Sequence, residues 1–407
     1  MNILFVIANL GVGGAQSFLL RMLSAFSKEH NIYLYDVHPK QRENEILTNL
    51  TSNIKIFSSP YERLEITLQK YPVIFTKILN RINQYLSIKS KLDKRYFNMI
   101  VKKYKIEIIN SHMYLADSFV YANLKYNIPK ISSFHGCYNL IWDKKRNDKS
   151  FKKIKKEIQS ILNSYSGVIL AAEKHKQVFK NYEISKQPAL QKIYYGFPQQ
   201  KINTVNLKQK YNLPENSFVF GMVARGDKSK GWQEAIDAFL LLQEEYNNVY
   251  LILAGGTDYL EKLKQTYKDN KEIIFTGNVN NPLDYISGFD IGLLPTYFPA
   301  ESLPNTVIEY LYCAKPVIAT NWAEIPKMIE YNGQKAGEII PLKNGKADIE
   351  TLYSAMKYYL ENPDKLVEHS QIAKQAFSKF DMKKCINAYI NFFEKNLNKW
   401  AVLLFPY

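Results

Sequence analysis

Residues 3–8 read Ile-Leu-Phe-Val-Ile-Ala and lead into a glycine-rich turn, Gly11-Val12-Gly13-Gly14. A short apolar run of this kind is typical of a buried strand, and glycines let the backbone turn sharply into a helix, which we predict near residues 16–28. The same order starts again at residues 218–223, Phe-Val-Phe-Gly-Met-Val, which precede a loop ending in Gly231. Because the pattern begins twice, the sequence predicts two doubly wound, Rossmann-like α/β domains.

The alternation of strand and helix continues through both halves of the chain. Further strands are predicted at residues 32–37, 106–110, 130–134, 168–171, 249–254, 272–276, 291–295 and 317–320, with a helix at 232–246. Such alternation favours parallel sheets covered by helices. The polar stretch 196–216 contains two prolines and is the predicted linker. We therefore expect an N-terminal domain over 1–200, a C-terminal domain over 201–377, and a C-terminal helix within 378–407 that returns to the N-terminal domain.

Composition excludes several classes of protein. The 407 residues are 46% apolar, which excludes a disordered chain. No apolar run approaches the ~20 residues of a membrane-spanning helix. The segment Met1–Ala8 has no basic region before it, so we interpret it as a strand and not as a signal peptide. The three cysteines are far apart, without metal-ligand spacing, as expected for reduced thiols in the cytoplasm.

The net charge of +16 is concentrated in one half, because residues 1–200 hold 31 Lys and Arg against 14 Asp and Glu. This indicates an anionic partner for the first domain, such as a membrane surface, a phosphorylated acceptor or nucleic acid, unless the charges only solvate the surface. Two stretches contribute most, a predicted basic insertion at 61–103 and a lysine cluster at 144–156. Either could lie on anionic lipid, or could be a core-packing helix with a solvated face. The insertion's apolar face would consist of Phe75, Ile78, Leu79, Ile82 and Leu86.

Three motifs carry the candidate chemistry. The first is the turn containing Gly13 and Gly14, with Asp36 at the end of the second strand. It is compatible with a dinucleotide site, a nucleotide-sugar site or a tight turn alone, since the third glycine of the dinucleotide pattern is replaced by Gln16. The second motif is the loop from Arg225 to Gly231, directly after a predicted strand. Its Arg225 and Lys230 could converge on a diphosphate, or the loop could be an ordinary solvated turn.

The third motif is the run from Pro299 to Glu309, which holds Glu301 and Glu309 eight residues apart. Pro304 predicts the first turn of a helix that continues through Leu311. Phosphate oxygens could then be bound by the backbone amides between Leu303 and Thr306, except at Pro304, which has no N–H group. The alternative is a helix with ordinary acidic residues near its N-terminus.

Together these motifs resemble glycosyltransferase family 4, which has the GT-B fold. The resemblance spans nearly the whole chain and is densest in residues 218–330. The glycine turn is similar to that family's N-terminal loop, the Arg-x4-Lys-Gly stretch to its diphosphate clamp, and the Glu-x7-Glu spacing to its donor motif. Two departures concern the donor: Ser302 stands where many members have glycine, and bulky residues follow Glu309.

The resemblance implies a role for each site residue. Arg225 and Lys230 would neutralise the leaving diphosphate, Glu301 would bind the donor sugar, and Glu309 would bind the ribose. Phosphate would be held by Gly13 and Gly14 of the first domain and by Ser302, Leu303, Pro304, Asn305 and Thr306. His135, which follows a first-domain strand, matches a histidine that faces the donor sugar, and His112 is a weaker candidate on the acceptor side.

The resemblance further implies a retaining reaction that moves a hexose or N-acetylhexosamine from a nucleotide diphosphate sugar, expected to be UDP-linked. We expect no other cofactor and no metal, because Arg225, Lys230 and a helix N-terminus can replace a cation. The first domain would bind a saccharide or polyprenyl-diphosphate-linked acceptor of cell-surface polysaccharide synthesis. The expected location is the cytoplasm, peripheral to the inner face of the plasma membrane.

Other functions compete with this interpretation. A sugar-nucleotide epimerase of the GT-B fold would need no acceptor. An NAD(P)-dependent oxidoreductase would use the glycine turn and Asp36, but it leaves the motifs around Arg225 and Glu301 unexplained. Nucleic-acid binding is motivated by charge alone, and the chain has no RNA-recognition or zinc-finger pattern, so we predict no nucleic-acid partner.

Overall fold

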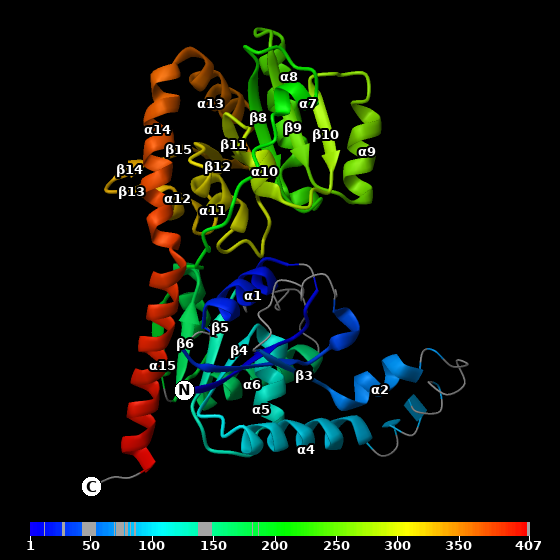
Figure 1. The fold of residues 1–407 in the computed structure, drawn as a ribbon, viewed down its shortest axis with the longest axis vertical. Coiled ribbons are helices and arrows are strands. Elements are labelled where there is room, and N and C mark those ends of the chain that lie inside the picture. Colours follow the sequence, from blue (N-terminus) through cyan, green and yellow to red (C-terminus); the bar gives the residue numbers. More distant parts are fainter. Residues whose placement is uncertain are drawn as a thin grey trace. The chain divides into compact units, whose positions relative to one another are not determined.

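The computed structural model describes residues 1–11, 13–26, 29–42, 54–68, 70, 77, 80, 81, 83, 84, 87–136, 149–180, 182–185 and 187–404. Residues 149–151 and 401–404 are described by their backbone only. The chain divides into two compact units, one formed by Met1–Pro198 with Met382–Tyr407, the other by Gln199–Asp381 (Figure 1).

The first unit contains a seven-stranded parallel sheet in the order β3-β2-β1-β4-β5-β6-β7. Its strands are β1 (Asn2–Ile7), β2 (Asn31–Asp36), β3 (Lys55–Ser58), β4 (Ile108–His112), β5 (Lys130–Phe134), β6 (Gly167–Leu170) and β7 (Ala189–Lys192). Its helices are α1 (Gly14–Phe26), α2 (Pro60–Leu68), α4 (Ile88–Lys103), α5 (Tyr114–Asn123), α6 (Lys149–Ser164) and α15 (Met382–Leu404). All the strands run in one direction, so their carboxyl ends meet at one edge.

Helices cover both faces of this sheet, because successive side chains of a strand point to opposite faces. Leu4 and Val6 of β1 belong to a buried cluster with Phe97 of α4 and Val120 of α5. Phe5, which lies between them, points to the other face. Its ring centroid lies 5.5 Å from that of Phe26 in α1, and 6.3 Å from that of Phe393 in α15.

The second unit repeats the topology with a six-stranded sheet in the order β10-β9-β8-β11-β12-β15. Its strands are β8 (Phe218–Val223), β9 (Val249–Ala254), β10 (Ile273–Gly277), β11 (Ile291–Leu294), β12 (Val317–Thr320) and β15 (Gly337–Ile340), beside two short hairpins, β13 (Glu330–Tyr331) with β14 (Gln334–Lys335) and β16 (Leu342–Lys343) with β17 (Lys346–Ala347). Its helices are α7 (Leu207–Lys210), α8 (Trp232–Gln243), α9 (Asp258–Thr266), α10 (Pro282–Ile286), α11 (Asn305–Tyr312), α12 (Ile325–Met328), α13 (Ile349–Glu361) and α14 (Pro363–Ala376).

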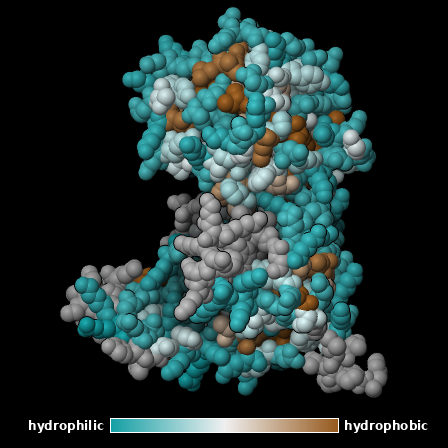
Figure 2. All heavy atoms as spheres, turned by 180° about the vertical axis from the view of Figure 1, so that it is seen from behind, coloured by the Kyte–Doolittle hydropathy of each residue, from teal (hydrophilic) through white to brown (hydrophobic). Residues whose placement is uncertain are grey.

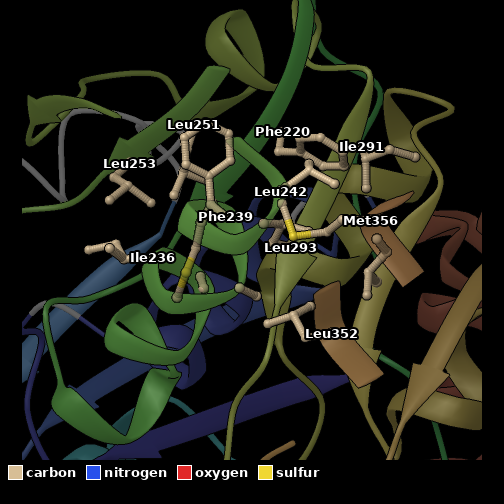
Figure 3. Close-up of a cluster of buried hydrophobic side chains, with 14 of the residues drawn as sticks. Phe220, Ile236, Phe239, Leu242, Leu251, Leu253, Ile291, Leu293, Leu352 and Met356 are labelled. Atoms are coloured by element: carbon tan, nitrogen blue, oxygen red, sulfur yellow. The ribbon is translucent and has the colours of Figure 1, made fainter. Parts of the chain in front are cut away.

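The core of the second unit lies between its central strands and helices α8 and α13. Figure 3 shows Phe239 of α8 among apolar side chains of the sheet, such as Leu251, with Met356 of α13 in the same cluster. The side chains of this cluster are nearly inaccessible to solvent. Burying an apolar side chain of this size contributes roughly 1.5–3 kcal/mol, so the cluster fixes β8, β9 and β11 firmly against the two helices.

The structure confirms the prediction of two doubly wound parallel α/β units. Each strand predicted from the sequence is present, with its ends within two residues of the predicted ones. The sequence did not indicate β3, β7 or β15. These three strands have four residues each, and all lie at the edges of their sheets, where burial imposes little apolar character.

The boundary between the two units, at Pro198 and Gln199, falls within the predicted linker 196–216. Parts of this stretch are nonetheless packed, because Phe197 is buried in the first unit and Leu207 in the second. One prediction about the organisation of the chain is wrong. Residues 61–103 are not an insertion throughout, because α4 is a regular helix of the fold whose Phe97 and Ile100 are buried in the core. The apolar face predicted from Phe75, Ile78, Leu79, Ile82 and Leu86 lies outside the described residues.

The first unit buries a carboxyl group at Asp117 of α5. Its oxygens accept hydrogen bonds from the hydroxyls of Ser111, in β4, and Ser132, in β5, the latter at 2.7 Å. Burial raises the pKa of Asp117 from an ordinary value near 3.8 to about 8, although the two hydroxyls oppose this shift. The folded chain therefore keeps this proton at pH values where the unfolded chain has lost it.

This linkage predicts a pH-dependent stability. The contribution of Asp117 is fully present below pH ~4 and is lost as pH rises towards 8, because the raised pKa belongs to the folded state. Asp117→Asn removes the titration. We expect its thermal unfolding midpoint, relative to the parent protein, to rise steadily from pH 5 to pH 8. Glu183→Gln, at an exposed carboxylate of the same unit, serves as the control and should show no such trend. A constant difference between Asp117→Asn and the parent across this range would contradict the assignment.

Candidate functional site

The candidate site of the second unit begins in the loop after β8. Asp227 accepts a hydrogen bond from the backbone amide of Ser229 at 2.9 Å, which starts a single helical turn over Lys228–Lys230. Gly231 then adopts a φ of +88°, a conformation that side chains other than glycine rarely adopt. A Cβ atom at Gly231 would lie 2.2 Å from the carbonyl oxygen of Pro295. The loop therefore packs closely against the segment after β11.

Lys230 meets Glu301 in a buried ion pair. The ammonium nitrogen lies 2.5 Å from Oε2 of Glu301, and Thr296 donates its hydroxyl to the same oxygen at 3.2 Å. Both charged side chains are about nine-tenths buried. A buried pair of this kind persists only when each charge has a good partner, because an isolated buried charge is strongly unfavourable.

Arg225 and Lys230 both lie close to the ring of Phe298. The Lys230 nitrogen lies 4.7 Å from the ring centroid of Phe298, and the guanidinium carbon of Arg225 lies 5.8 Å from it. Arg225 is exposed, whereas Lys230 is buried. The two cations predicted to form a diphosphate clamp therefore do lie on one ring, beside Glu301.

Helix α11 starts from this point. Ser302, Leu303 and Pro304 are buried in the turn that leads from Glu301 into the helix. Asn305 and Thr306 lie in its first turn, where backbone amides point out of the helix N-terminus. The helix begins one residue later than predicted, because Pro304 is extended, with ψ of 121°, and precedes the first helical residue.

Tyr310 fixes the direction of α11. Its hydroxyl accepts a hydrogen bond from the amide of Val223, at the end of β8, and donates one to the carbonyl oxygen of Leu293 in β11, each at 3.0 Å. Thr306 adds a hydrogen bond from its hydroxyl to the carbonyl oxygen of Val223 at 3.0 Å. The N-terminus of α11 is thus held at the carboxyl ends of the two central strands, where open α/β sheets bind ligands. Glu309 lies on the same helix and is 8% exposed.

The first unit carries the remaining predicted residues. Gly13 precedes α1 and Gly14 is the first residue of that helix, and a Cβ atom at Gly13 would approach the side-chain oxygen of Gln16 to 2.4 Å. Gln16 in turn donates a hydrogen bond to Asn9 at 3.3 Å. Gln16, which replaces the third glycine of the dinucleotide pattern, therefore packs its side chain against the glycine turn.

His135 follows β5 and is partly exposed. Its Nε2 lies 2.7 Å from Nδ1 of His112, and its Nδ1 lies 2.7 Å from the hydroxyl of Tyr195. Phe18 of α1 stacks on Tyr195, with ring centroids 4.3 Å apart. Burial lowers the pKa of both imidazoles well below the ordinary value of histidine, so both are neutral at pH 7.

The sequence did not single out Phe298, Thr296 or Tyr195. Thr296 follows β11 at the edge where ligands bind, and this position could have suggested it. Nothing in the sequence distinguishes Phe298 or Tyr195 from the chain's many other aromatic residues. Asp36, proposed for a dinucleotide ribose, is fully buried and pairs with Arg42 at 3.0 Å, so it is already neutralised within the unit.

The geometry at Gly231 yields a prediction on stability. Alanine in a left-handed conformation costs about 1–2 kcal/mol, and at position 231 its Cβ would also strike Pro295. We expect Gly231→Ala to lower the free energy of unfolding by clearly more than Gly333→Ala. Gly333 is the matched control, with φ of +81° and no atom within 4 Å of the added Cβ. Urea denaturation measures both; equal losses would show that the contact with Pro295 does not constrain the loop.

Comparisons with known proteins bear on the chain as a whole. Residues 203–376, somewhat less than half of the chain, match the family model of glycosyl transferases group 1. The chain is 25% identical over 299 residues to the capsular polysaccharide biosynthesis glycosyltransferase CapH of Staphylococcus aureus, which covers 67% of this chain and 76% of CapH.

Two solved structures show the same fold. Sucrose-phosphate synthase from Thermosynechococcus elongatus has a TM-score of 0.72 at 16% identity, covering 97% of this chain and 99% of that one. Anabaena HepE in complex with UDP has a TM-score of 0.71 at 16% identity, covering 97% and 100%. These likenesses confirm the predicted GT-B architecture of two Rossmann-like domains.

Proposed function

We propose that this chain, a glycosyltransferase, moves a hexose or N-acetylhexosamine from a nucleotide diphosphate sugar to a saccharide or polyprenyl-diphosphate-linked acceptor, with retention of anomeric configuration. The class of enzyme follows from the match to the group 1 family model. CapH, the relative named for capsular polysaccharide biosynthesis, supports an activity in polysaccharide synthesis. The presence of UDP in the HepE structure supports a UDP-linked donor.

The observation that carries the proposal is the buried pair of Lys230 and Glu301 on Phe298, at the N-terminus of α11. Without a donor, Glu301 neutralises Lys230. A diphosphate would bring charge that Lys230 and the exposed Arg225 can both meet, and the first amides of α11 favour phosphate oxygens. Glu301 could then accept hydrogen bonds from sugar hydroxyls, while Glu309 binds the ribose.

The proposed reaction breaks the bond between the anomeric carbon and the diphosphate oxygen, whose electron pair stays on the diphosphate. The acceptor oxygen forms its bond to the anomeric carbon on the same face, and its proton passes to the leaving phosphate. Lys230 and Arg225 stabilise the negative charge that develops on the leaving diphosphate. Such electrostatic stabilisation of the transition state is usually the largest single contribution to an enzyme's rate enhancement. The protein's own cations therefore serve in place of a metal ion in this proposal.

Lys230→Ala tests the clamp. Losing one placed group that stabilises developing charge typically costs about 10²–10³-fold in kcat, and we expect a loss of this size. Lys228→Ala is the matched control, because this exposed lysine lies two residues away in the same loop. We expect it to retain near-parent activity. Near-normal turnover in both Lys230→Ala and Arg225→Ala would exclude the clamp.

Folding must be separated from catalysis in this experiment. Lys230→Ala leaves Glu301 buried without its cation, which is destabilising. The double variant Lys230→Ala/Glu301→Gln removes the unpaired charge and should regain thermal stability but not activity. Product analysis by NMR supplies the assay: a retained anomeric configuration with acceptor present supports the proposal. Isomerised sugar nucleotide formed from the donor alone would instead favour an epimerase.

We also propose that the first unit approaches an anionic membrane surface at the inner face of the plasma membrane. Helix α6 exposes Lys152, Lys153, Lys155 and Lys156, whereas Ile158 and Leu162 of the same helix are buried in the core. Its apolar face is thus committed to the protein, so the contact would be electrostatic. On the face seen in Figure 2, hydrophobic residues lie in small patches among hydrophilic ones. Across the part of the chain described, no helix has the length and apolar character to cross a bilayer.

Vesicle flotation tests this contact. Each lysine near an anionic surface contributes about 1 kcal/mol, so changing all four exposed lysines of α6 to glutamine should weaken binding to phosphatidylserine vesicles at least tenfold. The matched control changes four exposed lysines of the second unit: Lys262, Lys264, Lys268 and Lys271. Flotation of the parent protein that is indifferent to anionic lipid and to salt would contradict the proposal.

A further inference from the structure

A continuous chain of hydrogen bonds links four side chains of the first unit. The hydroxyl of Tyr195 lies 2.7 Å from Nδ1 of His135, and Nε2 of His135 lies 2.7 Å from Nδ1 of His112. Nε2 of His112 lies 2.9 Å from the side-chain oxygen of Asn110. Asn110 and His112 are fully buried, and Tyr195 is 5% exposed. His135 is the most exposed of the four.

The orientation of the Asn110 amide determines which group donates and which accepts in each of these hydrogen bonds. Its Nδ2 donates to the carbonyl oxygen of Ile131 and to the hydroxyl of Ser133, each at 3.0 Å. A backbone carbonyl can only accept, so the amide nitrogen must face Ile131 and the amide oxygen must face His112. Two partners in β5 therefore fix which atom His112 meets.

The tautomers of both histidines then follow in turn. His112 must carry its proton on Nε2 to donate to Asn110. A neutral imidazole has one donor and one acceptor, so Nδ1 of His112 accepts, and His135 must donate from its own Nε2. Nδ1 of His135 is left to accept from the hydroxyl of Tyr195. Protonation of His112 would set two N–H groups against each other, and its complete burial opposes the charge.

This series of hydrogen bonds cannot conduct a proton away from His135 through His112. It ends on an amide oxygen, which accepts a hydrogen bond but does not take up a proton at neutral pH. Packing also restricts movement of the Tyr195 end, because the ring of Phe18 stacks on Tyr195 with an interplanar angle of 18°. These facts favour an orienting role over proton transfer.

We propose that Asn110, His112 and Tyr195 are positioning residues that hold His135 as the Nε2–H tautomer, with Tyr195 capping its Nδ1. Both ring nitrogens of His135 are then engaged within the unit. A sugar hydroxyl can reach Nδ1 only by displacing the hydroxyl of Tyr195, so Tyr195 and the donor sugar compete for one atom. This inference rests on the proposed function only where it assigns the competing ligand, a neutral sugar.

Side-chain NMR of the full chain, labelled with ¹⁵N-histidine, tests the tautomers directly. The chain has six histidines, so single substitutions can assign each resonance. We expect His112 and His135 both to be neutral at pH 7 and protonated at Nε2. Tyr195→Phe should leave His135 as Nε2–H and move its Nδ1 resonance towards that of an unbonded nitrogen. A neutral Nδ1–H form of His135, or an Nδ1 resonance unchanged in Tyr195→Phe, would overturn the proposal.

A pair of substitutions at His112 separates positioning from packing. His112→Asn can place an amide oxygen near the former Nδ1 and so keep an acceptor for His135, whereas His112→Leu fills the space without one. We expect the tautomer of His135 to become mixed in His112→Leu and to stay Nε2–H in His112→Asn. Should His112→Leu fail to fold, Tyr195→Phe carries the test alone.

Activity supplies an independent reading. Removal of a partner that orients a functional group typically costs 10–100-fold, so we expect a loss of about that size in kcat/KM for His112→Leu and substantial rescue in His112→Asn. Equal losses in both variants, with an unchanged tautomer, would overturn the positioning role. Failure of the proposed function is a different result: the parent protein would show the expected tautomers and yet transfer no sugar from any donor.

Discussion

The candidate site of the second unit depends on the buried contact between Lys230 and Glu301. A lysine and a glutamate can both be nine-tenths buried only because they face each other at 2.5 Å, with Thr296 adding a hydrogen bond. That contact requires the loop after β8 to approach the segment after β11 closely, and Gly231 permits it with a left-handed backbone and no side chain. The ion pair therefore depends on the conformation of the loop after β8 and on its close packing against the segment that leads into α11.

Much of this arrangement follows from the sequence, because parallel strands bring their carboxyl ends to one edge. The sequence predicted the strands 218–223 and 291–295, each followed by residues of a candidate motif, and Arg225, Lys230 and Glu301 do lie around Phe298. The central strands could also be located from the sequence, because both of their faces are buried and their residues are therefore mostly apolar. The short edge strands β3, β7 and β15 escaped prediction, because a strand with one neighbour is under weaker selection for apolar residues.

What the sequence could not provide is the pairing between polar side chains. Nothing in the order of residues indicates that His135 meets His112 and Tyr195, which lie 23 and 60 positions away. Likewise, a lysine-rich helix with apolar residues on one side fits a membrane surface and a protein core equally well. In α6 the core holds Ile158 and Leu162, and the lysines are left to the solvent.

The two units satisfy their buried polar groups in different ways, and the difference matches the chemistry proposed for each. In the second unit, Lys230 and Glu301 are kept charged as a buried ion pair. In the first unit, the histidines are neutral and joined by directed hydrogen bonds from Tyr195 to Asn110. Such a chain has no net charge to offer an anion, but it can exchange one hydroxyl for another. The second unit therefore stabilises its buried polar groups by opposite charges, and the first unit does so by hydrogen bonds between neutral groups.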